Sequence, residues 1–462
     1  MELFGDREKW GIRLIVDQFY LSCLSQASYL VGDARAGEAI VIDPRRDVEE
    51  YLERAREYGV RIVGVVNTHF HADFVSGHLE LQELTGAWIG LGAGAEADYE
   101  FRPLGHGERL NLGSLEVEIL GTPGHTWESI SILVHDPDGC SVVFTGDTLF
   151  VGDVGRPDLA AAVGADPEEL AHAQFRSLHE TLLSLPPETV VFPAHGAGSA
   201  CGRRLSPERQ STIGTEAATN PALQLDEEDF VADLLVGQPP APAYFAEDAV
   251  LNRRRRPALL ARPDLRPLGN AEIGRLHAAG VRVLDSRSPD DFAAGHLEGS
   301  INVGLDGRFA ETAGMFFRPG EQVIIVASDG RANEAALRLR RIGIDYPVGY
   351  VEDLESLLIF RGAGSARITP DVFNATRAKL DPILVDVRSP AEFDDGAIPG
   401  AISIPLAHLS ARADDLPDGR PIVVHCASGW RSSVAASYLR TRGRDVRDLH
   451  SGYRAWREST PV

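Results

Sequence analysis

Short apolar runs alternate with polar turns through the first half of the chain. The clearest runs span residues 39–43, 62–67, 115–120 and 140–145, and each is followed by a loop rich in Gly, Pro or His. Runs of this length bounded by turn residues are typical of buried β-strands. Helical patterns over residues 48–58 and 168–183 lie between them. The pattern predicts a layered α/β protein with polar motifs at its strand ends.

A stretch rich in Pro and Arg, residues 235–267, interrupts this pattern and marks a domain boundary. It contains the basic run Arg253–Arg256, which we interpret as a solvated linker. A docking site for an anionic ligand or another domain is the alternative.

The sequence repeats itself beyond this boundary. The segment DSRSPDDFAAGHLEGSI, which begins at Asp285, matches DVRSPAEFDDGAIPGAI, which begins at Asp386, without a gap. In each copy one strand precedes the motif, and another strand further along precedes a helix. Tandem copies of a small parallel sheet with helices on both faces are therefore predicted.

The chain has 462 residues, which is enough for about three domains of ordinary size. We predict a first domain over residues 1–245, a linker over residues 246–267, a cysteine-free copy of the repeat over residues 268–362, and a second copy over residues 363–462.

Charge and composition exclude several classes of protein. The net charge of −23 at pH 7 opposes general binding to nucleic acid. No apolar run approaches the ~20 residues that span a bilayer, and the start of the chain lacks the pattern of an export signal. We expect a cytoplasmic protein without a membrane partner. The four cysteines are too scattered for a disulfide framework or a paired-cysteine zinc site, so a functional one should act as a single thiol.

Four polar motifs each follow an apolar strand in the first domain. They are Asn67-Thr-His-Phe-His-Ala-Asp73, Thr122-Pro-Gly-His-Thr126, Thr145-Gly-Asp-Thr148 and Pro193-Ala-His-Gly196. Loops at strand ends commonly carry ligands. One His-x-His pair alone is often structural, but four such motifs together predict a metal centre.

These motifs resemble the metallo-β-lactamase fold, an αββα sandwich in which a His-x-His-x-Asp-His signature and later His, Asp and His residues surround one or two metals. The resemblance covers residues 1–240. Where two-metal hydrolases of this fold have a further histidine, this chain has Phe74, which offers no donor atom. A second ion would have to rely on Asp73, Asp147 and His195, so a two-zinc hydrolase is disfavoured.

Within this fold the sequence most resembles the persulfide dioxygenases. The resemblance implies one Fe(II) per chain held by His69, His125 and Asp147, a two-histidine, one-carboxylate set that leaves positions open. His71, Asp73 and His195 would then orient the ligands or bind water. Ordinary polar packing is the alternative for these three.

The segment Gly152-Asp-Val-Gly-Arg-Pro-Asp158 matches a part of the same family whose arginine faces the thiol substrate. The resemblance makes Arg156 a candidate anchor for an anionic thiol carrier, and a structural salt bridge is the alternative. Glutathione-using members often have a tyrosine just after the last histidine, whereas this chain continues His195-Gly-Ala-Gly. Coenzyme A or another small thiol therefore stays open beside glutathione.

The second copy of the repeat carries Cys426-Ala-Ser-Gly-Trp-Arg431 between an apolar strand and a helical segment. Backbone N–H groups of such a loop, with Arg431, stabilise a thiolate or persulfide. The loop resembles the Cys-x-x-Gly-x-Arg loop of rhodaneses, which implies that Cys426 is a sulfurtransferase nucleophile. Phosphatases of the tyrosine and dual-specificity classes are the alternative, but their loop holds one more residue.

The first copy has no cysteine at the corresponding place, where Ser328 follows the strand and the loop is expected to be shorter. A degenerate rhodanese-like domain with a scaffolding or docking role is predicted. Of the other cysteines, Cys23 and Cys140 are expected to be packing residues. Cys201 follows His195 closely and stands near Arg203 and Arg204, where cations favour a thiolate, so it is a candidate relay for sulfur beside the iron.

The whole chain resembles a persulfide dioxygenase fused to tandem rhodanese domains. The resemblance implies oxidation of small thiol persulfides by O₂ to sulfite and free thiol, transfer of sulfane sulfur between Cys426 and sulfite or thiosulfate, and a homodimer or homotetramer. The direction of transfer stays open. Alternatives are a glyoxalase II-like thioester hydrolase with a metal-bound hydroxide, and a sulfide sensor or sulfur carrier.

Overall fold

In the computed structural model of the chain, strand β2 (Gln26–Asp33) is buried along its whole length. Continuous burial requires cover on both faces of the sheet. The strand belongs to a six-stranded sheet with the order β1-β2-β3-β4-β5-β6. The other strands of this sheet are β1 (Leu14–Leu21), β3 (Glu38–Ile42), β4 (Arg61–Val66), β5 (Trp88–Gly92) and β6 (Arg102–Leu104).

A second six-stranded sheet has the order β14-β13-β10-β9-β8-β7. Its strands are β7 (Arg109–Leu112), β8 (Leu115–Gly121), β9 (Ile130–His135), β10 (Ser141–Gly146), β13 (Val190–Pro193) and β14 (Ser211–Thr212). Apolar side chains of both sheets form one core; the rings of Tyr29 and Phe144 lie 4.8 Å apart within it. A short hairpin of β11 (Leu149–Phe150) and β12 (Asp153–Val154) follows β10.

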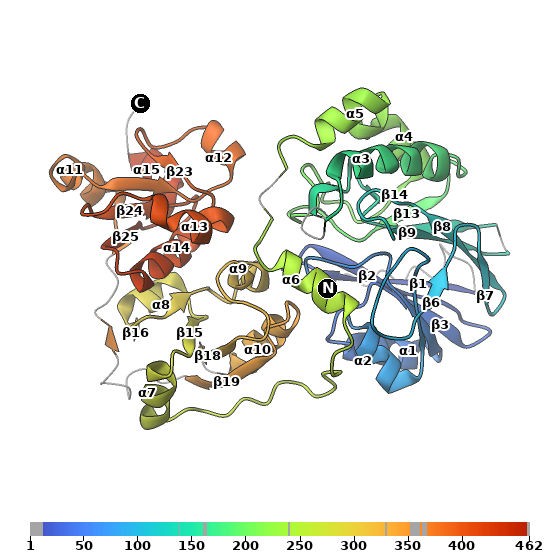
Figure 1. Cartoon of the computed structure of the whole chain (residues 1–462), viewed down its shortest axis with the longest axis horizontal. Coiled ribbons are helices and arrows are strands. Elements are labelled where there is room, and N and C mark those ends of the chain that lie inside the picture. The colour runs from blue at the N-terminus through green and yellow to red at the C-terminus, as the bar shows by residue number, and fades with distance from the viewer. Residues whose placement is uncertain are drawn as a thin grey trace. The chain divides into compact units, whose positions relative to one another are not determined.

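Helices cover the outer faces of the two sheets (Figure 1). Helix α1 (Glu49–Tyr58) packs Tyr51 and Ala55 on the first sheet, beside α2 (His78–Thr85). Helices α3 (Pro167–Arg176) and α5 (Glu227–Leu234) cover the second, and α4 (Ile213–Thr219) follows β14. Each outer layer buries an apolar stripe against its sheet. The αββα sandwich predicted for this part of the chain is therefore confirmed.

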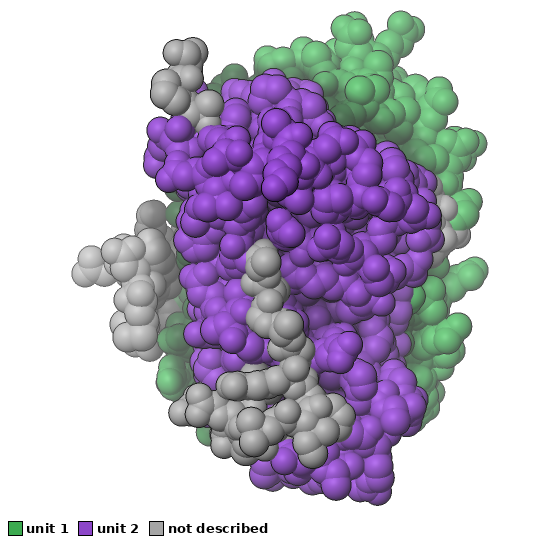
Figure 2. Space-filling model, turned by 90° about the vertical axis from the view of Figure 1, so that its left-hand side faces the viewer, with its two compact units in different colours: residues 1–241, 245–261 green, residues 242–244, 262–462 purple. Residues whose placement is uncertain are grey.

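The structure divides into two units, one of residues 1–241 and 245–261 and the other of residues 242–244 and 262–462 (Figure 2). It describes residues 13–137, 139–159, 164–238, 241–328, 330–351, 361–362 and 367–459. The start of the chain and the predicted start of the last domain at residue 363 lie outside the described residues. Within the described ranges no helix combines the length and apolarity needed to cross a membrane.

Residues 245–261 pack with the first unit, although residues 246–267 are expected to be a linker. Helix α6 (Phe245–Arg253) leads into Arg256, whose guanidinium forms a 2.6 Å ion pair with Glu80 of α2. Arg46 pairs with the same carboxylate at 3.1 Å. The side chains of Arg256 and Glu80 are 8% and 0% exposed, so the expectation of a solvated basic run is wrong for Arg256.

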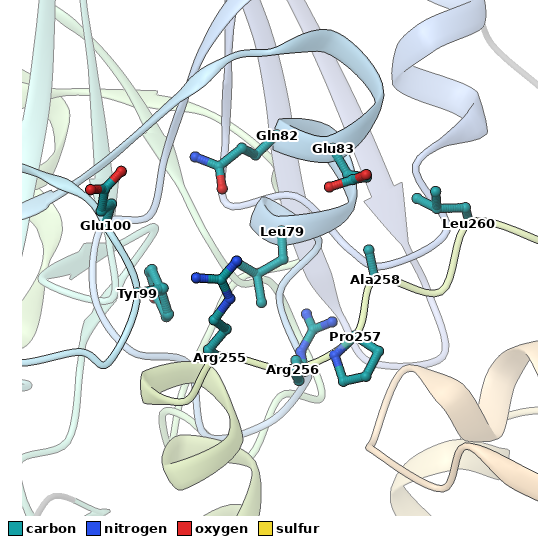
Figure 3. Close-up of a pocket in the computed structure, with 10 residues that line it drawn as sticks. All are labelled: Leu79, Gln82, Glu83, Tyr99, Glu100, Arg255, Arg256, Pro257, Ala258 and Leu260. Atoms are coloured by element: carbon teal, nitrogen blue, oxygen red, sulfur yellow. The ribbon is translucent and has the colours of Figure 1, made fainter.

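The same segment lies opposite α2, where it lines an open cavity of about 600 Å³ (Figure 3). Arg255 and Pro257 line this cavity from the segment, and Leu79 and Gln82 line it from α2. Arg256 also donates a hydrogen bond to the carbonyl of Ser76, two residues before α2. The segment therefore ties the start of α2 to α6.

Replacing Glu80 by Gln should lower the free energy of unfolding at pH 7 by about 3–5 kcal/mol, the usual cost of breaking a buried ion pair from one side. Burial raises the pKa of Glu80, but Arg256 and Arg46 outweigh it and lower the pKa from 4.5 to about 2. The stabilisation that the ionised Glu80 carboxylate gives the folded protein is complete above about pH 4.5 and is lost as the pH falls towards 2. Denaturant unfolding of the wild-type and Glu80→Gln proteins should therefore give free energies of unfolding whose difference becomes smaller at acid pH. Glu83→Gln, at an exposed position of the same helix, is the control; an unchanged stability of Glu80→Gln at pH 7 would contradict the prediction.

Two copies of one small α/β fold make up most of the second unit. The first has the sheet order β17-β15-β18-β19, formed by β15 (Arg282–Asp285), β17 (Ile301–Asn302), β18 (Gln322–Val326) and β19 (Tyr346–Val351). Its helices are α7 (Asn270–Ala278), α8 (Pro289–Ala294), α9 (Phe309–Gly314) and α10 (Ala332–Arg340), and β16 (His296–Leu297) pairs with β20 (Arg361–Gly362).

The second copy has the order β21-β25-β24-β22-β23, formed by β21 (Arg367–Ile368), β22 (Ile383–Asp386), β23 (Ile402–Ser403), β24 (Ile422–His425) and β25 (Val446–Leu449). Its helices are α11 (Pro370–Leu380), α12 (Pro390–Asp394), α13 (Leu406–Arg412), α14 (Trp430–Thr441) and α15 (Gly452–Ser459). Strands β23-β22-β24-β25 correspond in order to β17-β15-β18-β19. The predicted tandem repeat is confirmed.

Strand register shows which residue of the first copy takes the place of Cys426. Asp285 pairs with Val326 as Asp386 pairs with His425, so Ala327 corresponds to Cys426 and Ser328 does not. Residues 327–331 join β18 to α10, and residues 426–429 join β24 to α14. The expectation of a shorter loop in the first copy is therefore wrong. At this position the first copy has a methyl group in place of the thiol, and Ala332 stands where the second copy has Arg431.

Candidate metal centre and cysteine loop

The polar motifs at the strand ends of the sandwich meet in one buried cluster. His69, His71 and Asp73 follow β4, His125 follows β8, Asp147 follows β10 and His195 follows β13. All six side chains are at most 5% exposed. Buried groups of this kind are retained only where they pair with one another or with a cation.

One candidate ligand set comprises His69, His125 and Asp147, with one donor atom of each within 4.8 Å of the others. Nε2 of His125 and Nε2 of His69 lie 3.6 and 4.0 Å from Oδ2 of Asp147. Apart from the thiol of Cys201, no side chain that the structure describes forms a hydrogen bond with the carboxylate oxygens of Asp147. A buried carboxylate that lacks N–H and O–H donors and faces two imidazoles fits a bound cation.

Hydrogen bonds fix which nitrogen of two histidines faces the cluster. Nδ1 of His125 lies 2.7 Å from the carbonyl oxygen of Arg156, and Nδ1 of His195 lies 3.2 Å from that of Ser25. A carbonyl oxygen only accepts hydrogen bonds, so each Nδ1 carries the proton. Nε2 of both rings is left with a lone pair for a ligand.

Asp43, which the sequence analysis did not single out, orients the other two histidines. Its carboxylate accepts hydrogen bonds from the Thr68 hydroxyl at 2.8 Å and from Nε2 of His71 at 2.9 Å. Because the Thr68 hydroxyl donates to Asp43, its oxygen accepts from Nδ1 of His69, 3.0 Å away, and Nε2 of His69 is left open. The only sequence signal for Asp43 is its place at the end of an apolar strand.

Burial lowers the pKa values of the histidines in the cluster and raises those of the aspartates. It lowers the pKa of His125 to about 4 and that of His69 well below 6.5. It raises the pKa of Asp147 and of Asp73 to about 6. For His71 burial also lowers the pKa, but the charge and hydrogen bond of Asp43 outweigh it and raise the pKa. Neutral imidazoles beside carboxylates are the protonation state that binds a metal.

A second group of potential ligands comprises Asp73, His195 and Cys201, again within 4.8 Å of one another. Nε2 of His195 lies 3.5 Å from Oδ2 of Asp73 and 3.5 Å from Oδ1 of Asp147. Asp147 therefore lies between the two groups and offers one oxygen to each.

Cys201 is buried beside these carboxylates, and one of the two cations expected to activate it, Arg203, points elsewhere. The guanidinium of Arg203 forms an ion pair with Asp233. Burial, followed by the charges of Asp147 and Asp73, raises the pKa of Cys201 well above 9. The expectation that nearby cations favour a thiolate here is wrong, because cations beside a residue in sequence can point elsewhere.

Phe74 and Arg156 both lie beside the cluster. Phe74 is fully buried and its ring stacks on His71 with centroids 4.3 Å apart, so this position supplies packing and no ligand. The guanidinium of Arg156 is buried, pairs with Asp158 at 2.5 Å and donates to the carbonyl of Ala200 at 3.0 Å. This contact corresponds to the structural salt bridge considered as the alternative to substrate anchoring.

Asn252 of α6 holds the loop that carries the first motif. Its side-chain amide donates to the carbonyl oxygens of His71 and Phe74, both at 2.8 Å, and its oxygen accepts from the backbone N–H of Ser76 at 2.8 Å. Sequence reasoning missed this residue, because it lies more than 170 positions beyond the loop it supports.

Replacing Asn252 by Ala should weaken metal binding at this centre, measured with Fe(II), about 10- to 100-fold, the usual effect of removing a group that orients metal ligands. Three hydrogen bonds that fix residues 71–76 are lost together. Iron retained per chain at graded chelator concentrations measures the effect. Asn111→Ala, at an exposed position of β7, is the matched control, and equal iron retention by both variants would contradict the role assigned to Asn252.

The cysteine loop, residues Cys426–Arg431, begins directly after β24. Cys426 is 1% exposed, and its Sγ accepts a hydrogen bond from the N–H of Gly429 at 3.1 Å. Gly429 has a φ of 95°, a left-handed conformation that favours glycine, and α14 starts behind it. The N–H group and the helix start both stabilise negative charge on the sulfur.

Arg431 pairs with a carboxylate that the sequence analysis did not identify. Its two terminal nitrogens lie 2.7 and 2.8 Å from the oxygens of Glu392 on α12. Burial raises the pKa of Glu392, but Arg431 and Ser389 outweigh it and lower the pKa to about 2. An anionic substrate at Cys426 would therefore share Arg431 with Glu392.

Two family models match the chain. The model described as Metallo-beta-lactamase superfamily matches residues 21–195, and the model described as Rhodanese-like domain matches residues 272–353 and 369–459. The first range falls on the sandwich with its metal candidates. The other two fall on the two copies of the repeat, and the second includes Cys426.

Relatives and solved structures agree with these matches. The mitochondrial persulfide dioxygenase ETHE1 of Bos taurus is 30% identical over 48% of this chain and 80% of its own. A hydroxyacylglutathione hydrolase of Cereibacter sphaeroides is also 30% identical, over 50% of this chain and 83% of its own. The structure of a metallo-beta-lactamase from Staphylococcus aureus subsp. aureus COL has a TM-score of 0.68 and 32% identity, and covers 74% of this chain and 99% of that one.

Proposed function

The chain belongs to the metallo-β-lactamase superfamily and carries two rhodanese-like domains after that domain, and on this basis we propose that it is an iron-dependent persulfide dioxygenase joined to a sulfurtransferase. One observation carries the proposal. The buried side chains of His69, His125 and Asp147 bring their donor atoms together, and the same chain contains the Cys426 loop.

In this proposal one Fe(II) is held by the three residues of that set. Two imidazoles and one carboxylate are the ligands of non-haem iron oxygenases, and they leave positions open. When bound there, iron would supply the one-electron chemistry that allows O₂ to react with a persulfide. The overall reaction converts R-S-S⁻, O₂ and water to sulfite, free thiol and a proton, so the outer sulfur is oxidised and O₂ is reduced.

The surrounding residues hold the ligands in their orientations. Asp43 orients His69 through Thr68 and orients His71 directly. The carbonyl of Arg156 orients His125. We propose that Arg156 acts mainly in this way, since its guanidinium is occupied by Asp158. Glutathione, coenzyme A and other small thiols remain candidate carriers of the persulfide.

Cys426 is the proposed sulfurtransferase nucleophile. Its thiolate attacks the outer sulfur of a persulfide or of thiosulfate, the S–S bond of the donor breaks, and thiol or sulfite leaves with the electron pair. The resulting persulfide on Cys426 passes its outer sulfur to sulfite or a thiol by the same exchange. The N–H of Gly429 and the guanidinium of Arg431 are the groups that stabilise the anion.

A thioester hydrolase is the second candidate for the sandwich domain. It is favoured by the relative from Cereibacter sphaeroides and by the second ligand group, Asp73, His195 and Cys201, which shares Asp147 with the first. Two metal ions would suit activation of water for thioester cleavage. Phe74 argues against it, because a histidine ligand is missing there.

An O₂ electrode assay of the iron-loaded full-length chain with persulfides of several thiols tests the proposal. We expect O₂ uptake with matching sulfite formation, fastest for one carrier, and about one iron per chain. Two zinc ions per chain together with cleavage of a glutathione thioester, and no O₂ uptake, would overturn the dioxygenase in favour of the hydrolase. Binding of persulfide without turnover would leave only a carrier or sensor.

A further inference from the structure

The cysteine-free domain, residues 268–351, packs against the cysteine loop of the neighbouring copy. Gly304 lies just beyond β17, and a Cβ atom placed on it would come within 2.2 Å of the Trp430 ring. Trp430 directly follows Gly429, whose N–H donates to Cys426 Sγ. A side chain at residue 304 would therefore force the ring of Trp430, the residue next to Gly429, to move.

A second contact holds the helix that begins at this loop. Asn302 of β17 is fully buried; its side-chain oxygen accepts from the hydroxyl of Ser433 at 2.6 Å, and its backbone N–H donates to Ser437 at 2.9 Å. The amide of Asn302 also donates to the carbonyls of Asp285 and Arg287, at 3.1 and 3.0 Å. The asparagine is thus fixed within its own domain and in turn fixes the first turns of α14.

A third contact reaches the carbonyl oxygen of Gly429. Asp290 at the start of α8 pairs with Arg367 of β21 at 2.5 Å, and Arg367 donates to the carbonyl of Gly429 at 3.1 Å. Asp290 is 71% exposed, so this ion pair contributes little energy by itself. The buried hydrogen bonds of Asn302 and the close contact of Gly304 with Trp430, a residue that is 39% exposed, therefore carry most of the effect.

We propose that the cysteine-free domain is a positioning element for sulfur transfer, in which Gly304 and Asn302 hold the Gly429 N–H group and the start of α14 towards Cys426. The inference rests on the proposed role of Cys426. Gly429 has a left-handed conformation and donates its N–H to the sulfur, and the contacts of the neighbouring domain limit the movement of the residues on either side of this peptide. The domain without a nucleophile thus supplies the support that makes its neighbour's nucleophile reactive.

Gly304→Ala in the full-length chain tests this directly. We expect sulfur transfer from thiosulfate to fall about 10- to 100-fold in kcat, the scale of loss caused by small misplacement of reacting groups. Alkylation of Cys426 by iodoacetamide, followed on its own peptide by mass spectrometry, should become slower, and its pH profile should move to higher pH. Gly269→Ala is the matched control, since nothing lies within 4 Å of a Cβ there and its φ is −84°.

Two further variants keep the test decisive. Asn302→Ala should move the alkylation profile in the same direction through a different contact. In a Trp430→Leu background, which removes the large ring, Gly304→Ala should cost much less than in the wild-type chain, as expected for two residues that act through one contact. A structural defect alone would lower thermal stability but leave the alkylation profile of Cys426 in the folded protein unchanged.

The two hypotheses fail in different ways. If the wild-type chain transfers sulfur and Gly304→Ala and Asn302→Ala leave both transfer and the alkylation profile unchanged, the positioning role is overturned and the sulfurtransferase stands. If the wild-type chain transfers no sulfur but both variants still slow alkylation of Cys426, the sulfurtransferase fails and the positioning of the thiol stands.

Discussion

Replacement of His125 by alanine should remove bound iron and abolish O₂ uptake with every persulfide tested. Nε2 of His125 faces Oδ2 of Asp147 at 3.6 Å, and its Nδ1 is held by the carbonyl of Arg156. Loss of a direct ligand should cost more than the about 10- to 100-fold that loss of an orienting neighbour costs. The remaining imidazole of His69 and one carboxylate cannot complete the set.

Iron per chain and O₂ uptake, measured on the same preparation, check this result. His172→Ala is the matched control, since His172 lies on α3 with 39% of its side chain exposed and pairs with Glu227. Sulfur transfer by the His125→Ala variant should stay near the wild-type rate, which also shows that the chain has folded. Full O₂ uptake by an iron-containing His125→Ala protein would remove His125 from the proposed metal site.

The parts of the site that could be predicted from the sequence are those that depend on short, contiguous sequence patterns. An apolar strand followed by His, Asp or Cys places that side chain at a strand end, and this held for His69, His125, Asp147, His195 and Cys426, which all follow strands of the structure. The gapless match of the segments at Asp285 and Asp386 likewise predicted two copies of one fold, because a shared pattern of buried positions specifies a shared sheet order.

The parts that could not be predicted depend on packing between distant segments. Asn252 supports a loop far back in the chain, and no periodicity signals such a contact. Arg256 looked solvated because its neighbours are basic, yet burial against Glu80 decides its state. Cys201 stands beside arginines in sequence but faces carboxylates in space, which reverses the expected direction of its pKa.

Comparison of the two copies of the repeat shows which of them can carry a thiol nucleophile. Both copies keep an Asp–Arg pair whose fully buried aspartate is the last residue of β15 or β22, with 2.6 Å between Arg287 and Asp285 and between Arg388 and Asp386. Both join the next strand to a helix by a short loop. Only the second copy places a sulfur atom in this loop. Cys426 is therefore the candidate nucleophile of the two copies.

Replacing Cys426 by serine should therefore reduce thiosulfate formation to the background of the assay while O₂ uptake stays largely unchanged. A hydroxyl group cannot hold sulfane sulfur, and a serine oxygen at this place is not ionised by one N–H donor and a helix start. The proposed metal ligands belong to the other unit of the chain, so the variant should bind iron to the same extent as the wild-type protein.

Mass spectrometry after incubation with thiosulfate gives a second readout of the same prediction. The wild-type peptide that contains Cys426 should gain the mass of one sulfur atom, and the variant peptide should not. Cys140→Ser, at a half-buried position of the sandwich domain, is the matched control and should keep both activities. If O₂ uptake and sulfur transfer fell together in a folded Cys426→Ser protein, the thiol would take part in persulfide oxidation as well. The two sites would then form one reaction sequence in which sulfur passes through Cys426 before it is oxidised.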